Sequence, residues 1–251
     1  AERGKLTWPA TYFQYLGLFW LSIISFYLIG RFVVGLTFKN IKVESPFLHL
    51  FINIATGITV ATTFFSLFIT AGKTINLLTI YVVILFLWTL KKSSFSFTKN
   101  AATHFPILEL LIYGTAIYSL FALEIIRRND WSSVLQPAHL IDWGLYSVDV
   151  QTMLLAGQEN TYNVHNFLDA AYHGMTPYHY FELWIGGVWS KILPHLLPMY
   201  LFSLVVYPIL CLLALIAGWM WLDEVKSSTR RNRFLVFLCL FSAGWFFLSS
   251  R

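Results

Sequence analysis

The sequence predicts an all-α polytopic membrane protein with about six transmembrane helices and one large exoplasmic loop that contains surface helices. Three observations predict this fold class. Hydrophobic residues make up 57% of the 251 residues and charged residues only 12%, and the mean hydropathy of +0.65 is well above that of a soluble domain. Several apolar runs reach the roughly 17–25 residues that cross a bilayer. The positive charges lie in clusters between those runs, as in the loops of a membrane protein.

Six apolar runs are the predicted transmembrane helices. Four lie in the N-terminal region 1–126, at 12–34, 47–71, 75–90 and 105–126, and two lie in the C-terminal region 196–251, at 196–222 and 234–249. The third and the sixth are short for a span of about 20 residues, so they need little tilt or a thin bilayer. Cys211 and Cys239 lie inside these runs and are expected to be small apolar residues, not a disulfide or a metal site.

The clusters of Lys and Arg predict the orientation. The loops 35–46, 91–104 and 223–233 hold these clusters, so the positive-inside rule places them in the cytoplasm and places 72–74 and 127–195 outside. Because the charges are divided among several loops, the net charge of +5 does not predict a nucleic-acid surface. The same alternation puts Arg3 and Lys5 outside. Because positive residues favour the cytoplasm, either an earlier helix is missing or the first run behaves unusually. We expect the chain to be part of a longer protein, with additional membrane subunits as candidate partners.

The loop 127–195 concentrates the polar chemistry of the chain. Seven of the twelve acidic residues and four of the seven histidines lie in or at the edge of 124–182. A loop of this length is expected to fold into helices on the membrane surface. One predicted helix begins at Asp142, a favoured N-cap residue, and ends at Gly157. A second, at 181–193, is too short to span and is expected to be interfacial or re-entrant. A belt of tryptophans at headgroup level is predicted from Trp131, Trp143, Trp184 and Trp189.

Asp142, Tyr146 and Asp149 are spaced i, i+4 and i+7, which predicts two carboxylates and a phenol on one helix face. A carboxylate there could take a proton from an acceptor hydroxyl. It could also hold a divalent cation such as Mg²⁺ or Mn²⁺ against a phosphate leaving group. The alternative is that Asp142 only caps the helix and that Asp149 is solvated.

A run of polar aromatic residues follows at 172–182 and includes His173, Tyr178 and His179. Rings with one polar edge stack on sugars and hydrogen-bond to them, and histidine contacts phosphate or relays a proton. The alternative is an aromatic belt at the membrane interface. The spacing of His165, His173 and His179 matches no zinc signature, so no histidine metal site is predicted.

Charged residues also mark the fourth apolar run. Glu109 lies inside it, which predicts either a proton path in a transporter or a side chain that snorkels to the nearby cytoplasmic end. Arg127 and Arg128 end the run on the outer side. Two interpretations of this arginine pair stay open, namely binding of a lipid pyrophosphate and pairing with Glu124 and Asp130.

Three stretches of the loop are distinctive: DWGLYSVDVQTMLLAG at 142–157, NTYN at 160–163 and YHGMTPYHY at 172–180. They resemble the exoplasmic loop of polytopic GT-C-type glycosyltransferases and their bacterial relatives. The resemblance implies transfer of a sugar from a polyprenyl-phosphate donor to an acceptor on the outer face of the plasma (inner) membrane. It implies Asp142 as the first candidate catalytic residue and Asp149 as the second. It also implies that His173 and His179 lie near the donor phosphate or the acceptor. Together with the residues singled out above, the candidate substrate-binding residues are Tyr146, His173, Tyr178, His179, Arg127 and Arg128.

Two other functional classes remain open. A transporter or flippase subunit would carry polar groups along its spans. A non-catalytic assembly subunit would use the loop to bind a partner, and Asp142 and Asp149 would then be individually dispensable.

Overall fold

The computed structural model describes residues 8–37, 45–70, 107–129, 180–196 and 198–249, together with 146, 149–151 and 154–155. All regular elements in this part of the chain are helices. Their bounds are α1 (Trp8–Thr37), α2 (Pro46–Thr70), α4 (Ile107–Asn129), α7 (Tyr180–Ile192), α8 (Pro198–Leu201), the π-helical turn η3 (Phe202–Val206), α9 (Tyr207–Glu224) and α10 (Arg230–Ser249).

Four helical stretches in this part of the chain are long and apolar enough to cross a membrane. They are Ala10–Leu36, Pro46–Ser66, Ile107–Ile125 and Pro198–Glu224. They coincide with the first, second, fourth and fifth predicted spans, so the structure confirms an α-helical membrane protein. The third predicted span, 75–90, lies outside the described residues. The sixth corresponds to α10, whose first turn carries Arg230, Arg231 and Arg233 and which is not among the four.

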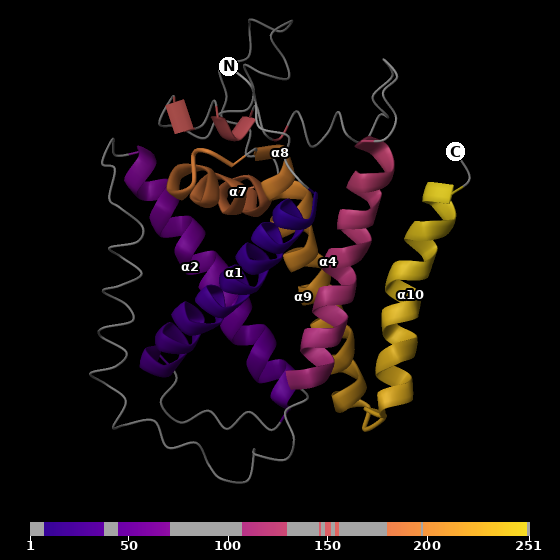
Figure 1. Cartoon of the computed structure of the whole chain (residues 1–251). Coiled ribbons are helices and arrows are strands. Elements are labelled where there is room, and N and C mark those ends of the chain that lie inside the picture. Colours follow the sequence, from indigo (N-terminus) through magenta and orange to yellow (C-terminus); the bar gives the residue numbers. More distant parts are fainter. Residues whose placement is uncertain are drawn as a thin grey trace, which may run out of the picture.

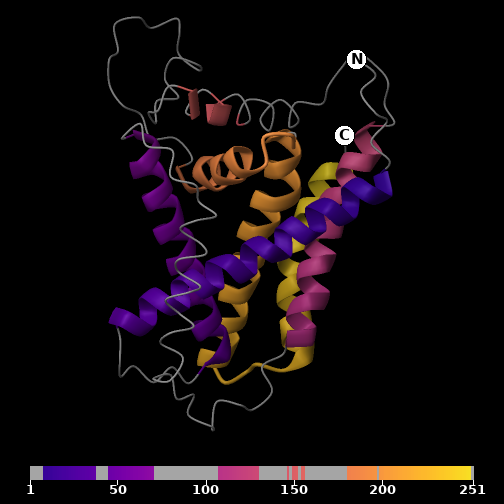
Figure 2. The same ribbon diagram turned by 60° about the vertical axis from the view of Figure 1, so that its left-hand side comes forward.

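The helices form a bundle with one helix across its end. Figure 1 shows α2, α4, α9 and α10 running along the length of the molecule, with α1 crossing them obliquely and α7 lying across one end, and Figure 2 shows the same arrangement from the side. We call this the α7 end. At the opposite end α9 turns into α10, close to the starts of α2 and α4, and we call it the arginine end after the three arginines of α10.

Two glycines allow α1 and α2 to cross at very short range. A β-carbon added to Gly30 would lie 1.7 Å from the Asn53 carbonyl oxygen, and one added to Gly57 would lie 1.8 Å from the Phe26 carbonyl oxygen. Lipid offers no hydrophobic gain for helix association, so close backbone packing through small residues is a main source of affinity between membrane helices. The two glycines therefore make α1 and α2 one tightly packed pair.

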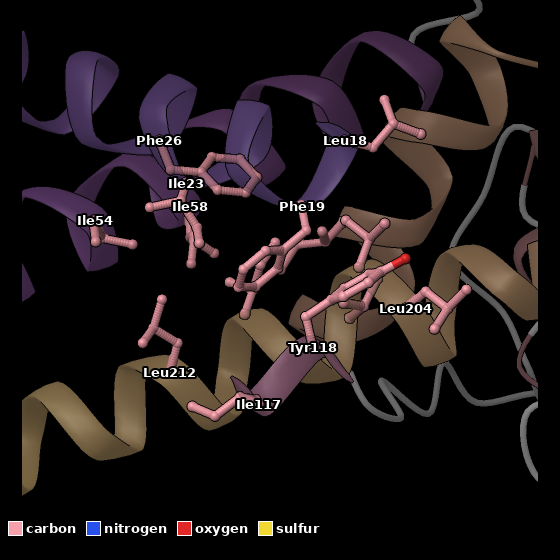
Figure 3. Close-up of a cluster of buried hydrophobic side chains, with 14 of the residues drawn as sticks. Leu18, Phe19, Ile23, Phe26, Ile54, Ile58, Ile117, Tyr118, Leu204 and Leu212 are labelled. Carbon is pink, nitrogen blue, oxygen red and sulfur yellow. The ribbon is translucent and has the colours of Figure 1, made fainter. Parts of the chain in front are cut away.

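The core of the bundle lies where α1, α2, α4 and α9 meet. Figure 3 shows Phe19, Ile54, Ile117 and Leu212 pointing toward one another from these four helices, and all four side chains are buried. Next to them the Tyr118 hydroxyl donates a hydrogen bond to the Tyr12 carbonyl oxygen at 2.6 Å. This bond ties α4 to α1 at a depth where an unpaired polar group would be costly.

The fifth predicted span contains a π-helical turn. From Pro198 to Glu224 the helix is continuous but contains the π turn η3, in which the Tyr207 N–H donates to the Phe202 carbonyl oxygen five residues earlier. Pro208 explains the turn. It has no N–H to give to the Leu204 carbonyl, and its ring would clash with that carbonyl in a regular helix. The π turn relieves this clash without ending the helix.

Candidate functional site

The segment with the predicted acid site is helical wherever the structure describes it, at 146, 149–151 and 154–155. Tyr146 and Asp149, three residues apart, therefore lie on nearly the same helix face, as the spacing predicts. Asp142, the predicted first residue of this helix, and Gly157, its predicted end, lie outside the described residues. The described pieces lie at the α7 end, beside α7 (Figure 1).

This segment packs against α7. A β-carbon added to Gly187 would lie 3.9 Å from Val150 Cγ1 and 4.0 Å from Leu154 Cδ2. Val150 and Leu154 thus lie at ordinary van der Waals distance from this position of α7. The same β-carbon would lie 3.4 Å from the Phe65 ring of α2, so this face of α7 contacts both α2 and the segment that carries Asp149.

Asp149 has no exposed surface. The alternative in which Asp149 is a solvated surface residue is therefore wrong. A carboxylate that leaves water pays a large desolvation cost, and ionisable residues kept inside membrane proteins generally serve a function. Val150, the next residue, is also fully buried. Both side chains are therefore covered by other parts of the protein and not by solvent.

Tyr146 lies against two rings at the π turn. Its ring centroid is 6.0 Å from that of Phe202 and 6.5 Å from that of Tyr207. Phe202 is fully buried, and its ring also contacts α7, because a β-carbon on Gly186 would lie 2.5 Å from Phe202 Cζ. Tyr146, α7 and the π turn thus meet at Phe202.

The tryptophans of α7 do not form the predicted belt facing the headgroups. Trp184 is fully buried and Trp189 is 9% exposed. The Trp184 ring lies edge-on to Phe65 with centroids 5.6 Å apart. The belt prediction is wrong for these two residues, because α7 packs under the Asp149 segment and against α2 instead of facing lipid. Trp131 and Trp143 lie outside the described residues.

Two polar groups at the end of α7 are missed by the sequence reasoning. Trp189 Nε1 and Ser190 Oγ are buried, and in the part of the chain that the structure describes neither has a hydrogen-bond partner. An indole N–H and a hydroxyl are both donors, and a buried donor without a partner is costly. Their sequence signal is only a polar residue beside a tryptophan in an apolar helix, which does not distinguish these buried groups from exposed ones.

The other predicted site residues are only partly placed. Arg127 and Arg128 belong to the last turns of α4, at the α7 end, and their side chains lie outside the described residues. His173, Tyr178, His179 and Asp142 lie outside them as well. Among the described residues, no three His, Cys, Asp or Glu side chains come together in a way that could hold a metal ion. The structure therefore brings together Tyr146 and Asp149 of the predicted set.

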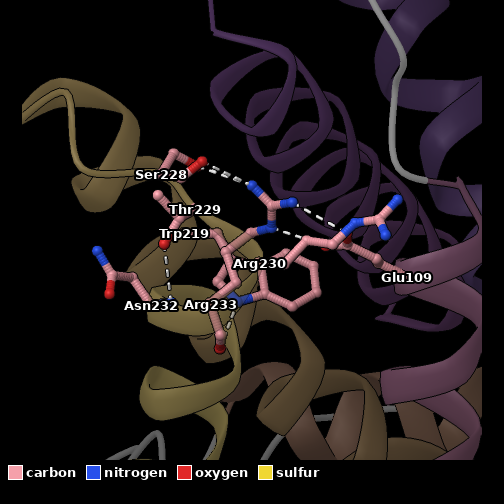
Figure 4. Close-up of polar contacts among 7 residues, drawn as sticks. All are labelled: Glu109, Trp219, Ser228, Thr229, Arg230, Asn232 and Arg233. Carbon is pink, nitrogen blue, oxygen red and sulfur yellow. Dashed lines mark hydrogen bonds and ion pairs between the residues drawn. The ribbon is translucent and has the colours of Figure 1, made fainter.

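Glu109 lies at the arginine end, far from Asp149, and is held by two arginines of α10. Arg233 donates from Nε to Glu109 Oε2 at 2.7 Å and from Nη2 to Oε1 at 2.9 Å, and Arg230 Nε lies 3.2 Å from Oε1. Figure 4 shows this fork, with Arg233 also bonded to Ser228. Bidentate pairing of this kind gives a strong and specific contact. Glu109 therefore joins α4 to α10.

Other contacts strengthen the arginine end. The Arg233 guanidinium lies over the Phe47 ring of α2, 5.7 Å from its centroid. The Ser45 hydroxyl donates to Asp223 Oδ2 at 2.6 Å and accepts the Leu48 N–H, so it caps α2 and ties that helix to the end of α9. Because 178 residues separate Ser45 from Asp223, no local pattern in the sequence predicts this pair.

Comparison of the chain with family models, with curated proteins and with solved structures finds no match.

Proposed function

We propose that the chain is a membrane glycosyltransferase that moves a sugar from a polyprenyl-phosphate donor to an acceptor on the outer face of the plasma membrane. The observation that carries the proposal is Asp149, a fully buried carboxylate at the end of a membrane helix bundle. A base at this depth can reach a donor whose lipid tail stays in the bilayer and whose phosphate lies at the membrane boundary. The resemblance of the loop to GT-C-type enzymes supports the same chemistry.

The arrangement of the helix ends supports an exoplasmic site. The loops 35–46 and 223–233 adjoin the arginine end, where Ser45 meets Asp223, and the loop 91–104 leads to the start of α4 at the same end. These are the three positively charged loops, so the positive-inside rule assigns the arginine end to the cytoplasm. The α7 end then faces outward. With 75–90 and α10 as further spans, the chain has the proposed six.

In the proposed reaction Asp149 is the general base. It takes the proton of the acceptor hydroxyl while the acceptor oxygen bonds to the anomeric carbon of the sugar, and the bond from that carbon to the phosphate oxygen breaks. Polyprenyl phosphate leaves with the bonding electrons, and Arg127 and Arg128 at the end of α4 would neutralise its charge. Asp142 would act as a second acid or would hold a Mg²⁺ or Mn²⁺ ion.

The remaining predicted residues would bind the sugar. Tyr146, His173, Tyr178 and His179 supply rings with polar edges, which suit stacking on a sugar and hydrogen bonding to its hydroxyls. Asp149 is fully buried in this structure, so the acceptor would reach it only after the protein around it moves. Such gating of a membrane site would keep water away from the donor between turnovers.

An amide substitution tests the proposal. Asp149→Asn keeps the shape of the side chain and removes the base, so release of polyprenyl phosphate from radiolabelled polyprenyl-phosphate sugars should fall about 100-fold or more. The protein is assayed in nanodiscs, with gel filtration to show that the variant stays monodisperse. Glu224→Gln is the matched control, because this exposed acid lies at the arginine end. Turnover by Asp149→Asn within a few-fold of the parent protein would refute the catalytic role and favour an assembly subunit.

A further inference from the structure

Phe202 and Tyr207 lie at the two ends of the π turn, and each ring contacts Tyr146; we call these two rings the aromatic platform. In a regular α-helix, residues five apart point about 140° away from each other. Here the Tyr207 N–H bonds to the Phe202 carbonyl oxygen, which brings residues five apart to the same side of the helix. The π turn therefore lets both rings contact a single partner.

That partner is Tyr146, whose ring is within aromatic contact distance of both platform rings. Tyr146 lies one helical turn before Asp149 and on nearly the same face. The contact thus holds the turn of helix that carries Asp149 at a defined height above the bundle. Gly187 of α7 provides a second support, close to Val150 and Leu154.

We infer that Tyr146 is a positioning residue, which rests its ring on the aromatic platform of the π turn and thereby fixes the place of Asp149. Pro208 belongs to the same device, because it forces the π turn that brings the two platform rings together. The inference deepens the proposed function, since it says how the proposed base is held. The contact itself can be measured without any turnover.

The experiment is a disulfide cross-link between the segment and α7. A cysteine Sγ at position 150 would take the place of Val150 Cγ1, which lies 3.9 Å from where a β-carbon of residue 187 would be, close enough for a disulfide after a small shift. Val150→Cys and Gly187→Cys are combined in a chain with Cys211→Ser and Cys239→Ser. Cross-linking by a mild oxidant in nanodiscs is followed by mass spectrometry.

Removing the Tyr146 ring should free the segment. Tyr146→Ala is expected to lower the rate of cross-linking about tenfold, and Tyr146→Phe, which keeps the ring, should cross-link like the parent protein. Pro208→Ala allows a regular helix, separates the platform rings, and should lower the rate as Tyr146→Ala does. Tyr113→Ala is the matched control: it removes a half-buried tyrosine that also contacts two rings, Trp219 and Phe237, at the other end of the bundle.

The outcomes separate the two proposals. Unchanged cross-linking in Tyr146→Ala or in Pro208→Ala, or an equal loss in Tyr146→Phe, would overturn the inference. A drop in Tyr113→Ala equal to that in Tyr146→Ala would also overturn it, because the effect would then be general loosening. If cross-linking responds as expected while Asp149→Asn retains turnover, the proposed function fails and the positioning contact stands.

Discussion

Glu109 and Asp149 are acidic residues at opposite ends of the bundle, and their environments differ. Glu109 meets two guanidinium groups at the arginine end, so its charge is used to hold α4 against α10. Asp149 is fully buried at the α7 end, on a short piece of helix that rests on α7 and the π turn. A carboxylate locked in a bidentate pair is poorly suited to carry protons along a path. Glu109 is therefore better explained as a link between α4 and α10 than as part of a proton path.

At the scale of single residues, the pair of Glu109 and Arg233 should be measurable as stability. Both side chains are mostly buried, with 18% and 12% exposed. Glu109→Gln should therefore lower the free energy of unfolding by about 1–3 kcal/mol, because Arg233 keeps its charge and loses its partner. Thermal unfolding in nanodiscs, followed by tryptophan fluorescence, measures the change.

The double variant Glu109→Gln/Arg233→Gln separates pairing from general damage. If the two residues act together, the double variant should lose less stability than the sum of the single variants. Glu224→Gln, in which an exposed acid at the same end is replaced, should melt like the parent protein. Additive losses in the double variant would show that the pair does not join the two helices.

At the scale of elements, the crossing of α1 and α2 decides how the bundle packs. Gly30→Ala should lower the free energy of unfolding by about 1–3 kcal/mol, because the new methyl group meets the Asn53 carbonyl and the backbones must separate. Gly17→Ala in the same helix is the control, since a β-carbon there has nothing within 4 Å. It should be neutral or slightly stabilising, as alanine favours helix more than glycine does. Equal melting temperatures for the two variants would contradict the close crossing.

At the scale of the whole molecule, the proposed orientation can be tested in intact cells. Leu155, at the α7 end, is 89% exposed, and Glu224, at the arginine end, is exposed. In a chain with Cys211→Ser and Cys239→Ser, a membrane-impermeant maleimide should label Leu155→Cys directly. It should label Glu224→Cys only after the cells are permeabilised, because the arginine end is proposed to face the cytoplasm. The reverse pattern would invert the topology and remove the exoplasmic site.

Much of the fold could be predicted from the sequence, because the thickness of the bilayer sets the length of each transmembrane helix. The four candidate spans and the short helix α7 lie where apolar runs predict them. The π turn inside the fifth span was not predicted, since hydropathy does not report the backbone effect of Pro208. The candidate site was predicted in part. Helical spacing brought Tyr146 and Asp149 to one face, while the partners of that face come from distant segments.

The sequence by itself determined that the chain is a membrane protein, because composition and the length of the apolar runs predict insertion into a bilayer directly. It also marked Asp149 as a candidate, through spacing on one helix. Only the tertiary structure decided that Asp149 is buried, that Trp184 and Trp189 face protein, and that Glu109 binds Arg233. These outcomes depend on contacts between helices that are far apart in the sequence; Glu109 and Arg233, for example, are 124 residues apart. No local sequence pattern predicts packing of this kind.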